Sequence, residues 1–308
     1  MQNTRRNVFV AAQWLFAAAI VWFAVRALRG QWANAGERLA AVRPQWSWIA
    51  LATVIVFLTY WLLIETWRRI VEASGEKLAP NDAARIWFVS NLGKYVPGKV
   101  WSIAAMTVMA KNQRVSPVVA AGSSVLTQLV TVAAGIGVAL VAGAGTLDRP
   151  VVAIVAAGVI VAGLIAAPTI LPALGRTAGS LTGRQIVLPS MSPKVVWLAM
   201  GSGVVAWIAY GIAFQFFVRG VLGSAAGATT SYIAVYAASY IIGFLALFAP
   251  GGAVVRESAM VTGMVRLGLT GQADALAVAI ASRLWLTVTE LLPGMVYMAA
   301  GKRALRSE

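Results

Sequence analysis

Neither cysteine nor histidine occurs among the 308 residues of this chain, and only ten residues are acidic. The missing residue types exclude thiolate nucleophiles, disulfide bonds, imidazole bases and zinc sites of the usual kinds. The acidic residues include no aspartate pair with metal-ligand spacing, and there is no Walker-type phosphate loop. We therefore expect no metal, no cofactor and no enzymatic activity, although an intramembrane transferase stays open as an alternative.

What the chain has in abundance is apolar residues. They make up 60% of the sequence against 11% charged residues, and the mean hydropathy is +0.79. Apolar runs long enough to cross a bilayer recur along the chain, which predicts an all-α, polytopic membrane bundle. The full spans are expected at 8–25, 46–64, 117–143, 150–172, 195–218 and 273–300. A cleaved signal peptide is the alternative for the first run, and 173–194 is expected to be a polar connection.

The net charge is +15, and the basic residues lie mostly in short loops between apolar runs. In a soluble protein this excess would suggest nucleic-acid binding. In a membrane protein it is typical of orientation signals and of contact with anionic headgroups. We expect a membrane partner and no nucleic acid.

A Pro-Gly motif interrupts two of the helix-like segments. The first copy is Tyr95-Val96-Pro97-Gly98-Lys99-Val100, inside 83–110, and the second is Phe248-Ala249-Pro250-Gly251-Gly252-Ala253, inside 229–266. Proline disfavours helical structure in the residue before it, and glycine loosens the turn. Interrupted helices at matching places in two halves are typical of transporters built from repeats. We expect one domain, 1–308, with repeat halves at about 46–145 and 195–300.

The basic residues also favour an orientation. If both broken segments enter and leave on one side, thirteen basic residues fall inside and seven outside. The inner set is Arg5, Arg6, Arg68, Arg69, Lys77, Lys111, Arg114, Arg176, Arg184, Lys194, Lys302, Arg303 and Arg306. The outer set is Arg26, Arg29, Arg38, Arg43, Arg149, Arg219 and Arg266. If both broken segments instead cross the membrane fully, ten basic residues fall on each side. The positive-inside rule predicts about six full spans, two re-entrant hairpins in an inverted repeat, and both termini inside.

The breaks and the charges beside them are the candidate binding site. A half-helix that begins inside the bundle presents its positive end to an anion, most naturally a phosphate. The candidate substrate-binding residues are Asn91, Lys94, Tyr95, Pro97, Gly98, Lys99, Pro250, Gly251, Gly252, Arg256, Glu257, Arg283 and Glu290. Each charge in the bilayer interior costs about 2.5–3.5 kcal/mol on insertion scales. Our hypothesis is that Glu257 pairs with Arg283 and leaves Arg256 for a lipid phosphate. A purely structural ion-pair network, or a packing kink at each break, is the alternative.

These motifs resemble the lysylphosphatidylglycerol synthase transmembrane family, which is flippase-like. The stretch Pro250–Glu257, followed by Gly268, Arg283 and Gly294, is similar to its second motif, and Asn91–Lys99 is similar to its first. Two features depart from the pattern. Val254 stands where a glycine is usual, and Ser102 and Ala105 stand where many members have Glu and Arg.

The resemblance implies two inverted hairpins at a lipid-accessible cavity of the bacterial inner membrane. It also implies translocation of an anionic phospholipid or a polyprenyl-phosphate-linked lipid. The aminoacyl-transferring members carry a large soluble domain after the membrane part, whereas this chain stops at Glu308. We therefore expect a stand-alone translocation module, with a second copy or a partner synthase as further partners. A scaffold for envelope lipid or glycan synthesis is the remaining alternative.

Overall fold

The computed structural model describes residues 43–95, 100–146, 150–182, 192–246, 252 and 254–304. This part of the chain is helical and contains no strand. The α-helices are α2 (Trp46–Ala73), α3 (Pro80–Asn91), α4 (Val100–Asn112), α5 (Pro117–Gly143), α6 (Pro150–Thr182), α7 (Pro193–Leu222), α8 (Thr229–Leu245), α9 (Val255–Arg266) and α10 (Gln272–Ala304). The short 3-10 helices η1 (Leu92–Tyr95) and η2 (Ala144–Thr146) follow α3 and α5.

Four of these helices are long and apolar enough to cross a membrane. They are Trp46–Ala73, Pro117–Gly143, Pro193–Leu222 and the Gln272–Ala300 part of α10. Pro150–Ala166 and Thr229–Leu245 are shorter apolar helices. The prediction of a polytopic helical membrane protein is therefore confirmed. The predicted first span, 8–25, lies outside the described residues, so the number of full spans stays a prediction.

One predicted boundary is wrong. The polar connection expected at 173–194 begins later, because α6 continues to Thr182 before the chain leaves the described residues at 183–191. Ser and Thr in this stretch suggested a loop, but they are tolerated in a helix that a long apolar run has already nucleated.

Both broken segments consist of two packed helices, as their sequences predict. The first is α3, the η1 turn and α4, and the second is α8 followed by α9. The second begins at Thr229 and ends at Arg266, in agreement with the predicted bounds. Residues 96–99, 247–251 and 253 lie outside the described residues, so the breaks themselves are seen only through their flanking helices.

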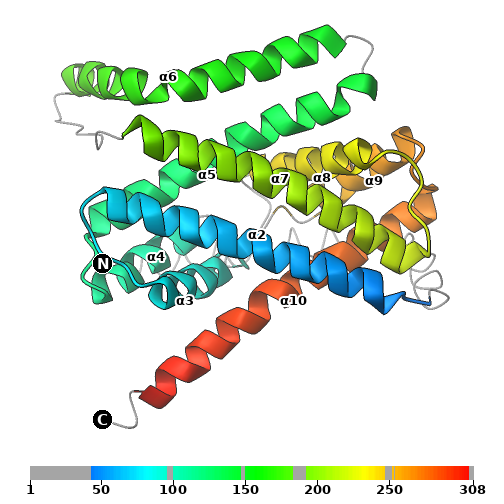
Figure 1. Ribbon diagram of the computed structural model, residues 1–308, viewed down its shortest axis with the longest axis horizontal. Coiled ribbons are helices and arrows are strands. Elements are labelled where there is room, and N and C mark those ends of the chain that lie inside the picture. The colour runs from blue at the N-terminus through cyan, green and yellow to red at the C-terminus, as the bar shows by residue number, and fades with distance from the viewer. Residues whose placement is uncertain are drawn as a thin grey trace, which may run out of the picture.

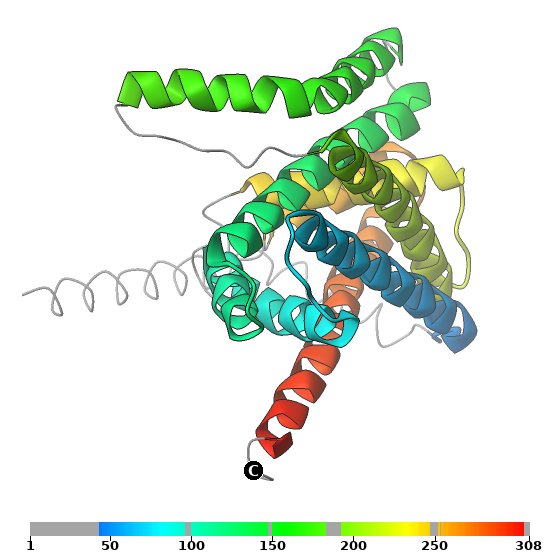
Figure 2. The same ribbon diagram turned by 60° about the vertical axis from the view of Figure 1, so that its left-hand side comes forward.

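The helices form a bundle in which α2 lies beside α7, and α5 packs against α7 and α8 (Figure 1). Helix α6 lies at the edge of the bundle (Figures 1 and 2), where it contacts α5 and α7. Helix α10 contacts both broken segments, through α3 and η1 on one side and α9 on the other. Helix α5 also contacts both, through α4 and α8, so α5 and α10 each connect the two hairpins.

Three tryptophan side chains join helices that are far apart in the sequence. The indole N–H of Trp67 donates to Ser123 Oγ at 3.0 Å, and that of Trp207 donates to the Thr131 carbonyl at 2.7 Å. Trp285 donates to Thr53 Oγ1 at 2.9 Å. A buried indole N–H needs a partner in an apolar interior, so each bond fixes one helix pair: α2 to α5, α7 to α5, and α10 to α2.

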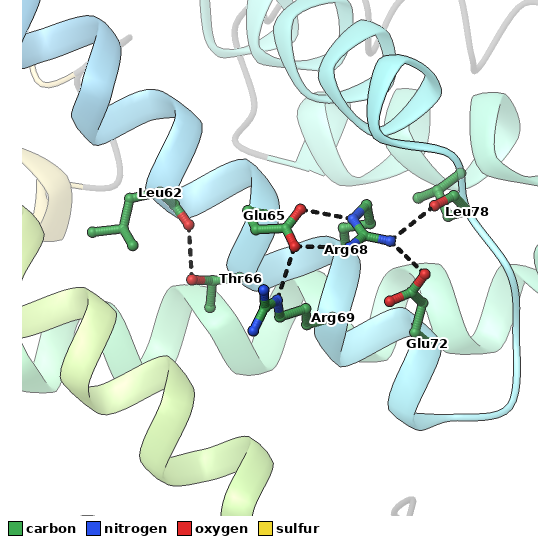
Figure 3. A network of polar contacts seen from close by, with 7 residues as sticks. All are labelled: Leu62, Glu65, Thr66, Arg68, Arg69, Glu72 and Leu78. Carbon is green, nitrogen blue, oxygen red and sulfur yellow. Dashed lines mark hydrogen bonds and ion pairs between the residues drawn. The ribbon is translucent and has the colours of Figure 1, made fainter.

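The last turns of α2 carry a network of charged side chains (Figure 3). Arg68 Nε donates to Glu65 Oε2 and Arg68 Nη2 donates to Glu65 Oε1, both at 2.7 Å. Arg69 Nε donates to the same carboxylate at 2.8 Å, and Arg68 Nη1 also contacts Glu72 and the Leu78 carbonyl. The network holds the end of α2 to the segment that leads into α3.

Candidate functional site

One face of α8 presents two tyrosines and a glycine. Tyr236, Tyr240 and Gly243 are spaced four and three residues apart, which places them on one side of the helix. This face is turned toward the start of α9, because α8 and α9 pack against each other. The three residues form the seat for a charged side chain of α9.

Arg256 occupies that seat. Its residue is only 7% exposed, and its Cζ atom lies 5.6 Å from the ring centroid of Tyr236 and 5.4 Å from that of Tyr240. The ring faces attract the cation but accept no ordinary hydrogen bond from it. Nε and Nη2 of Arg256 are buried and have no hydrogen-bond partner in the structure. Among the buried side-chain nitrogens and oxygens of the described residues, these two alone are unsatisfied.

Arg68 shows what the same two nitrogens do when a partner is present. Its Nε and Nη2 atoms form a parallel pair of hydrogen bonds with the two oxygens of Glu65 (Figure 3). This side-on fork is the geometry in which a guanidinium binds a carboxylate or a phosphate. In Arg256 the same fork is empty. Because an unpartnered buried charge is strongly unfavourable, the arrangement indicates a site for an anion with two oxygens.

Gly243 determines how closely Arg256 can approach α8. A Cβ atom on Gly243 would lie 2.7 Å from the Cβ atom of Arg256. A Cβ atom on Gly252 would lie 2.5 Å from the Gly243 carbonyl oxygen, and Gly252 has a positive φ of +67°. Both contacts require glycine. The predicted site residue Gly252 is therefore buried at the point where the broken segment folds back on α8.

Glu257 holds the start of α9 in place through both of its carboxylate oxygens. Oε1 accepts a hydrogen bond from Arg283 Nη1 at 3.1 Å, and Oε2 accepts one from the Val254 backbone N–H at 2.6 Å. The ion pair predicted between Glu257 and Arg283 is thus confirmed. The second contact was not foreseen. It shows that a protein carboxylate already occupies part of the positive end of α9. The Nε and Nη2 donors of Arg256, one residue earlier in the chain, have no such partner among the described residues.

Val254, the position where the related motif has glycine, lies in the left-handed region with φ +70°. A β-branched residue rarely adopts this conformation, which costs about 1–3 kcal/mol where the surroundings enforce it. Here the enforcing contact is the hydrogen bond from the Val254 N–H to Glu257. The departure from the family pattern therefore stores backbone strain two residues before Arg256.

Replacing Val254 by glycine is expected to stabilise the protein. Glycine adopts positive φ without a Cβ clash, so the strain is relieved, and we expect a gain of about 1 kcal/mol, offset in part by the greater freedom of the unfolded chain. Tryptophan fluorescence during thermal unfolding in detergent measures the midpoint. The control is Val255→Gly, which puts glycine one residue later, inside α9, and should lower the midpoint. A Val254→Gly protein less stable than wild type would contradict the strain.

The remaining predicted residues of the second half lie on α10. Arg283 reaches toward α9, as described above, and Glu290 lies two turns further on, near α2. The Tyr60 hydroxyl lies 3.4 Å from Glu290 Oε1 and 3.3 Å from Thr289 Oγ1. The structure thus brings Gly252, Arg256, Glu257 and Arg283 together and places Glu290 beside Tyr60. Sequence reasoning missed Tyr60, Tyr236, Tyr240 and Gly243. Of these four, only Tyr236, Tyr240 and Gly243 have a sequence signal, which is the spacing that places them on one face of α8.

The predicted residues of the first half are only partly placed. Asn91 is the last residue of α3 and is half-buried. Lys94 and Tyr95 belong to η1, with their side chains outside the described part. Pro97, Gly98, Lys99, Pro250 and Gly251 also lie outside it. The η1 turn packs closely against α10. A Cβ atom on Gly294 of α10 would lie only 3.1 Å from the Leu92 side chain.

The chain matches a known protein family. A family model described as the lysylphosphatidylglycerol synthase TM region matches residues 10–294. The match covers most of the chain, including both Pro-Gly motifs, the Tyr236–Gly243 face and α10 as far as Gly294. It confirms the resemblance seen in the motifs. A search among curated proteins found no match.

Proposed function

Since the chain belongs to the family of the lysylphosphatidylglycerol synthase transmembrane region, we propose that it translocates an anionic lipid. The lipid is a phospholipid or a lipid-linked intermediate, and the membrane is the inner membrane of a bacterium. The family and the membrane-spanning helices support a protein that acts on lipids within the bilayer. The direction of movement is set by which leaflet supplies the lipid.

The observation that carries the proposal is the empty fork of Arg256. A lipid phosphodiester has two non-ester oxygens, which match the Nε and Nη2 donors as the Glu65 carboxylate matches those of Arg68. Both nitrogens are buried within an apolar bundle, where a bound phosphate and the guanidinium neutralise each other. A lipid can bring its phosphate to this depth because its tails remain in the hydrocarbon.

Translocation requires that the site open to each leaflet in turn. We propose that the α3–α4 and α8–α9 hairpins are re-entrant, enter from opposite faces, and rock against the rest of the bundle. Helix α10 connects them, since Arg283 binds Glu257 of the second hairpin and Gly294 packs against Leu92 of the first. A displacement of one hairpin is therefore transmitted to the other through α10, and also through α5, which contacts α4 and α8.

The geometry gives less support to an intramembrane transferase. Glu257, the carboxylate nearest Arg256 in sequence, has one oxygen on Arg283 and the other on the Val254 N–H. A general base must reach the proton that it abstracts, and both oxygens of Glu257 are engaged by donors of the protein. The carboxylate is arranged to hold the hairpin rather than to accept a proton.

The test is translocation in proteoliposomes. Wild-type protein should move a tail-labelled phosphatidylglycerol between leaflets faster than a tail-labelled phosphatidylcholine, as followed by the fraction of label that an impermeant reductant bleaches. Arg256→Lys should lose the anionic activity, whereas Arg219→Lys, which changes an exposed arginine at the end of α7, should retain it. Folded wild-type protein that binds anionic lipid but moves none would contradict translocation and favour a scaffold or a transferase.

A further inference from the structure

The second helices of the two broken segments, α4 and α9, have the same pattern of burial. Residues 103–113 and 257–267 are buried, half-buried and exposed in the same order, position by position. Both helices also end in the same way, at a residue with positive φ: Arg114 at 62° and Gly268 at 64°. The two helices therefore correspond residue by residue, although their sequences differ.

The buried faces of α4 and α9 make the same kind of contact. The sulfur of Met106 lies 2.7 Å from the Ser124 hydroxyl of α5, and the sulfur of Met260 lies 3.7 Å from the Ser282 hydroxyl of α10. Each half-helix thus packs a methionine against a serine of the long helix that follows it. The correspondence therefore extends from burial to side-chain contacts.

The outer faces of the two helices differ in chemistry. The outer face of α4 consists of Ala104, Val108 and Asn112, and that of α9 consists of the corresponding residues Ser258, Thr262 and Arg266. Val108 of α4 and Leu284 of α10 are both 62% exposed, as expected of side chains that face lipid. Polar and ionisable residues at membrane depth instead face the bundle or a water-filled cavity. Helix α9 is therefore polar where a lipid-facing helix would be apolar.

The two hydroxyls on the outer face of α9 also lack an internal partner. Thr53 of α2 donates to the Ile49 carbonyl four residues earlier at 2.8 Å, and Thr127 of α5 makes the same kind of bond. Such a bond satisfies a helical hydroxyl in an apolar environment. The hydroxyls of Ser258 and Thr262 make no hydrogen bond to any described residue. They need a partner from outside the protein.

Helix α9 lies at the depth of α8, which is an apolar helix (Figure 1). The start of α9 contacts the end of α8, where a Cβ atom on Gly243 would lie 2.7 Å from the Arg256 Cβ atom. Further along α9, a Cβ atom on Gly263 would lie 3.1 Å from the Val235 side chain. Both exposed hydroxyls lie between these two contacts, so they lie beside the apolar length of α8.

We infer that the outer face of α9 borders a water-filled crevice within the membrane, whereas the corresponding face of α4 borders lipid. Arg266, at the end of α9, lies at the mouth of the crevice, and Ser258 lies about 12 Å further in along the helix. Water supplies the partners that both hydroxyls lack. Arg256 faces α8 on the other side of α9, so the crevice is separate from the anion site and does not depend on which lipid is moved.

Thiol labelling of single-cysteine variants in lipid nanodiscs tests the crevice. The wild-type chain contains no cysteine and gives no background. The probe is a sulfonated methanethiosulfonate, which stays in water and reacts with the ionised thiol. Ser258→Cys and Thr262→Cys should react at rates within about tenfold of Arg266→Cys, because thiols in water ionise normally.

The matched controls occupy the corresponding positions of α4. Ala104→Cys and Val108→Cys should react at least about a hundredfold more slowly than Asn112→Cys at the end of α4, because a thiol in an apolar environment stays protonated. Labelling after denaturation counts the thiol in each protein, and tryptophan fluorescence during thermal unfolding shows that each variant was folded.

Slow labelling of either α9 variant in folded protein would overturn the crevice, because lipid or a second copy of the chain would then cover this face. Fast labelling of all four variants would overturn the assignment of the α4 face to lipid. Neither result bears on the phosphate site, which Arg256→Lys tests, so the proposed function stands or fails separately.

Discussion

Replacing Arg256 by lysine is expected to reduce the anionic lipid that co-purifies with the protein by at least about tenfold, although the charge is kept. Lysine offers a point charge on a flexible chain and cannot present the Nε and Nη2 fork. It also loses the contact of the guanidinium group with the rings of Tyr236 and Tyr240. Native mass spectrometry of wild type and variant, purified from the same membranes, measures the bound lipid directly.

Arg219 provides the matched control for this substitution. Its Cζ atom lies 4.2 Å from the ring centroid of Trp48, so it also stacks on an aromatic side chain, but it is exposed at the end of α7. Arg219→Lys should leave the co-purified lipid within about twofold of wild type. Equal losses in the two variants would show that any stacked arginine at the membrane binds headgroups, and no loss in Arg256→Lys would show that the fork holds no lipid.

Reversing the charge of Glu257 or Arg283 alone is expected to destabilise the protein severely. The ion pair is largely buried, with side chains 13% and 24% exposed, and removing one partner of such a pair typically costs about 3–5 kcal/mol. Glu257→Arg should also lose the hydrogen bond to the Val254 N–H. We expect each single variant to unfold roughly 10 °C below wild type in detergent, followed by tryptophan fluorescence.

The double reversal, Glu257→Arg with Arg283→Glu, should recover more than half of that loss. Recovery should be incomplete, because arginine at position 257 restores the ion pair but cannot accept from the Val254 N–H. Glu72→Arg is the control, since it breaks the exposed side of the Arg68 network and should shift the midpoint by only a few degrees. If the midpoint of the double variant falls by as much as the two single variants together, the ion pair itself contributes nothing to stability.

The parts of the fold that sequence predicts well are those that local rules determine. Four spans are long apolar runs, which begin near Trp46, Pro117, Pro193 and Gln272. Within a bilayer, a single segment can satisfy its own backbone hydrogen bonds only as an α-helix, so each run predicts a helix. The second broken segment was predicted because proline and glycines interrupt its apolar run at Pro250-Gly251-Gly252. The continuation of α6 to Thr182 was missed, because glycine, serine and threonine after residue 172 suggested a loop, although they are tolerated in a helix that an apolar run has already nucleated.

The sequence predicted the charged residues of the site but missed its tyrosines and Gly243. Charges inside an apolar run stand out, so Arg256, Glu257 and Arg283 were identified, and the pairing of Glu257 with Arg283 followed from the cost of an unpaired charge in the bilayer. Tyr60 lies 230 positions from Glu290, and nothing in its own helix distinguishes it from a packing residue. Such contacts depend on how the helices pack, which no local pattern specifies.

The empty fork of Arg256 had one signal in the sequence. Arg68 has Glu65 three residues before it and Glu72 four residues after it, both on its own helical face. Arg256 has only its neighbour Glu257, and adjacent residues of a helix point in different directions. The sequence thus indicates that Arg256 has no partner on its own helix. Only the structure shows that α8 offers it two aromatic rings and no acceptor.

The measurement that tests the central claim most directly is solid-state NMR of protein in native-like bilayers, with 15N in the arginine guanidinium groups and natural 31P in the lipids. Dipolar recoupling between 31P and 15N reports only nuclei in close contact. The account predicts a 31P–15N contact at Nε and Nη that is present in wild type, kept in Arg219→Lys and absent in Arg256→Lys. Identical recoupling in wild type and Arg256→Lys would contradict a phosphate bound in the Arg256 fork.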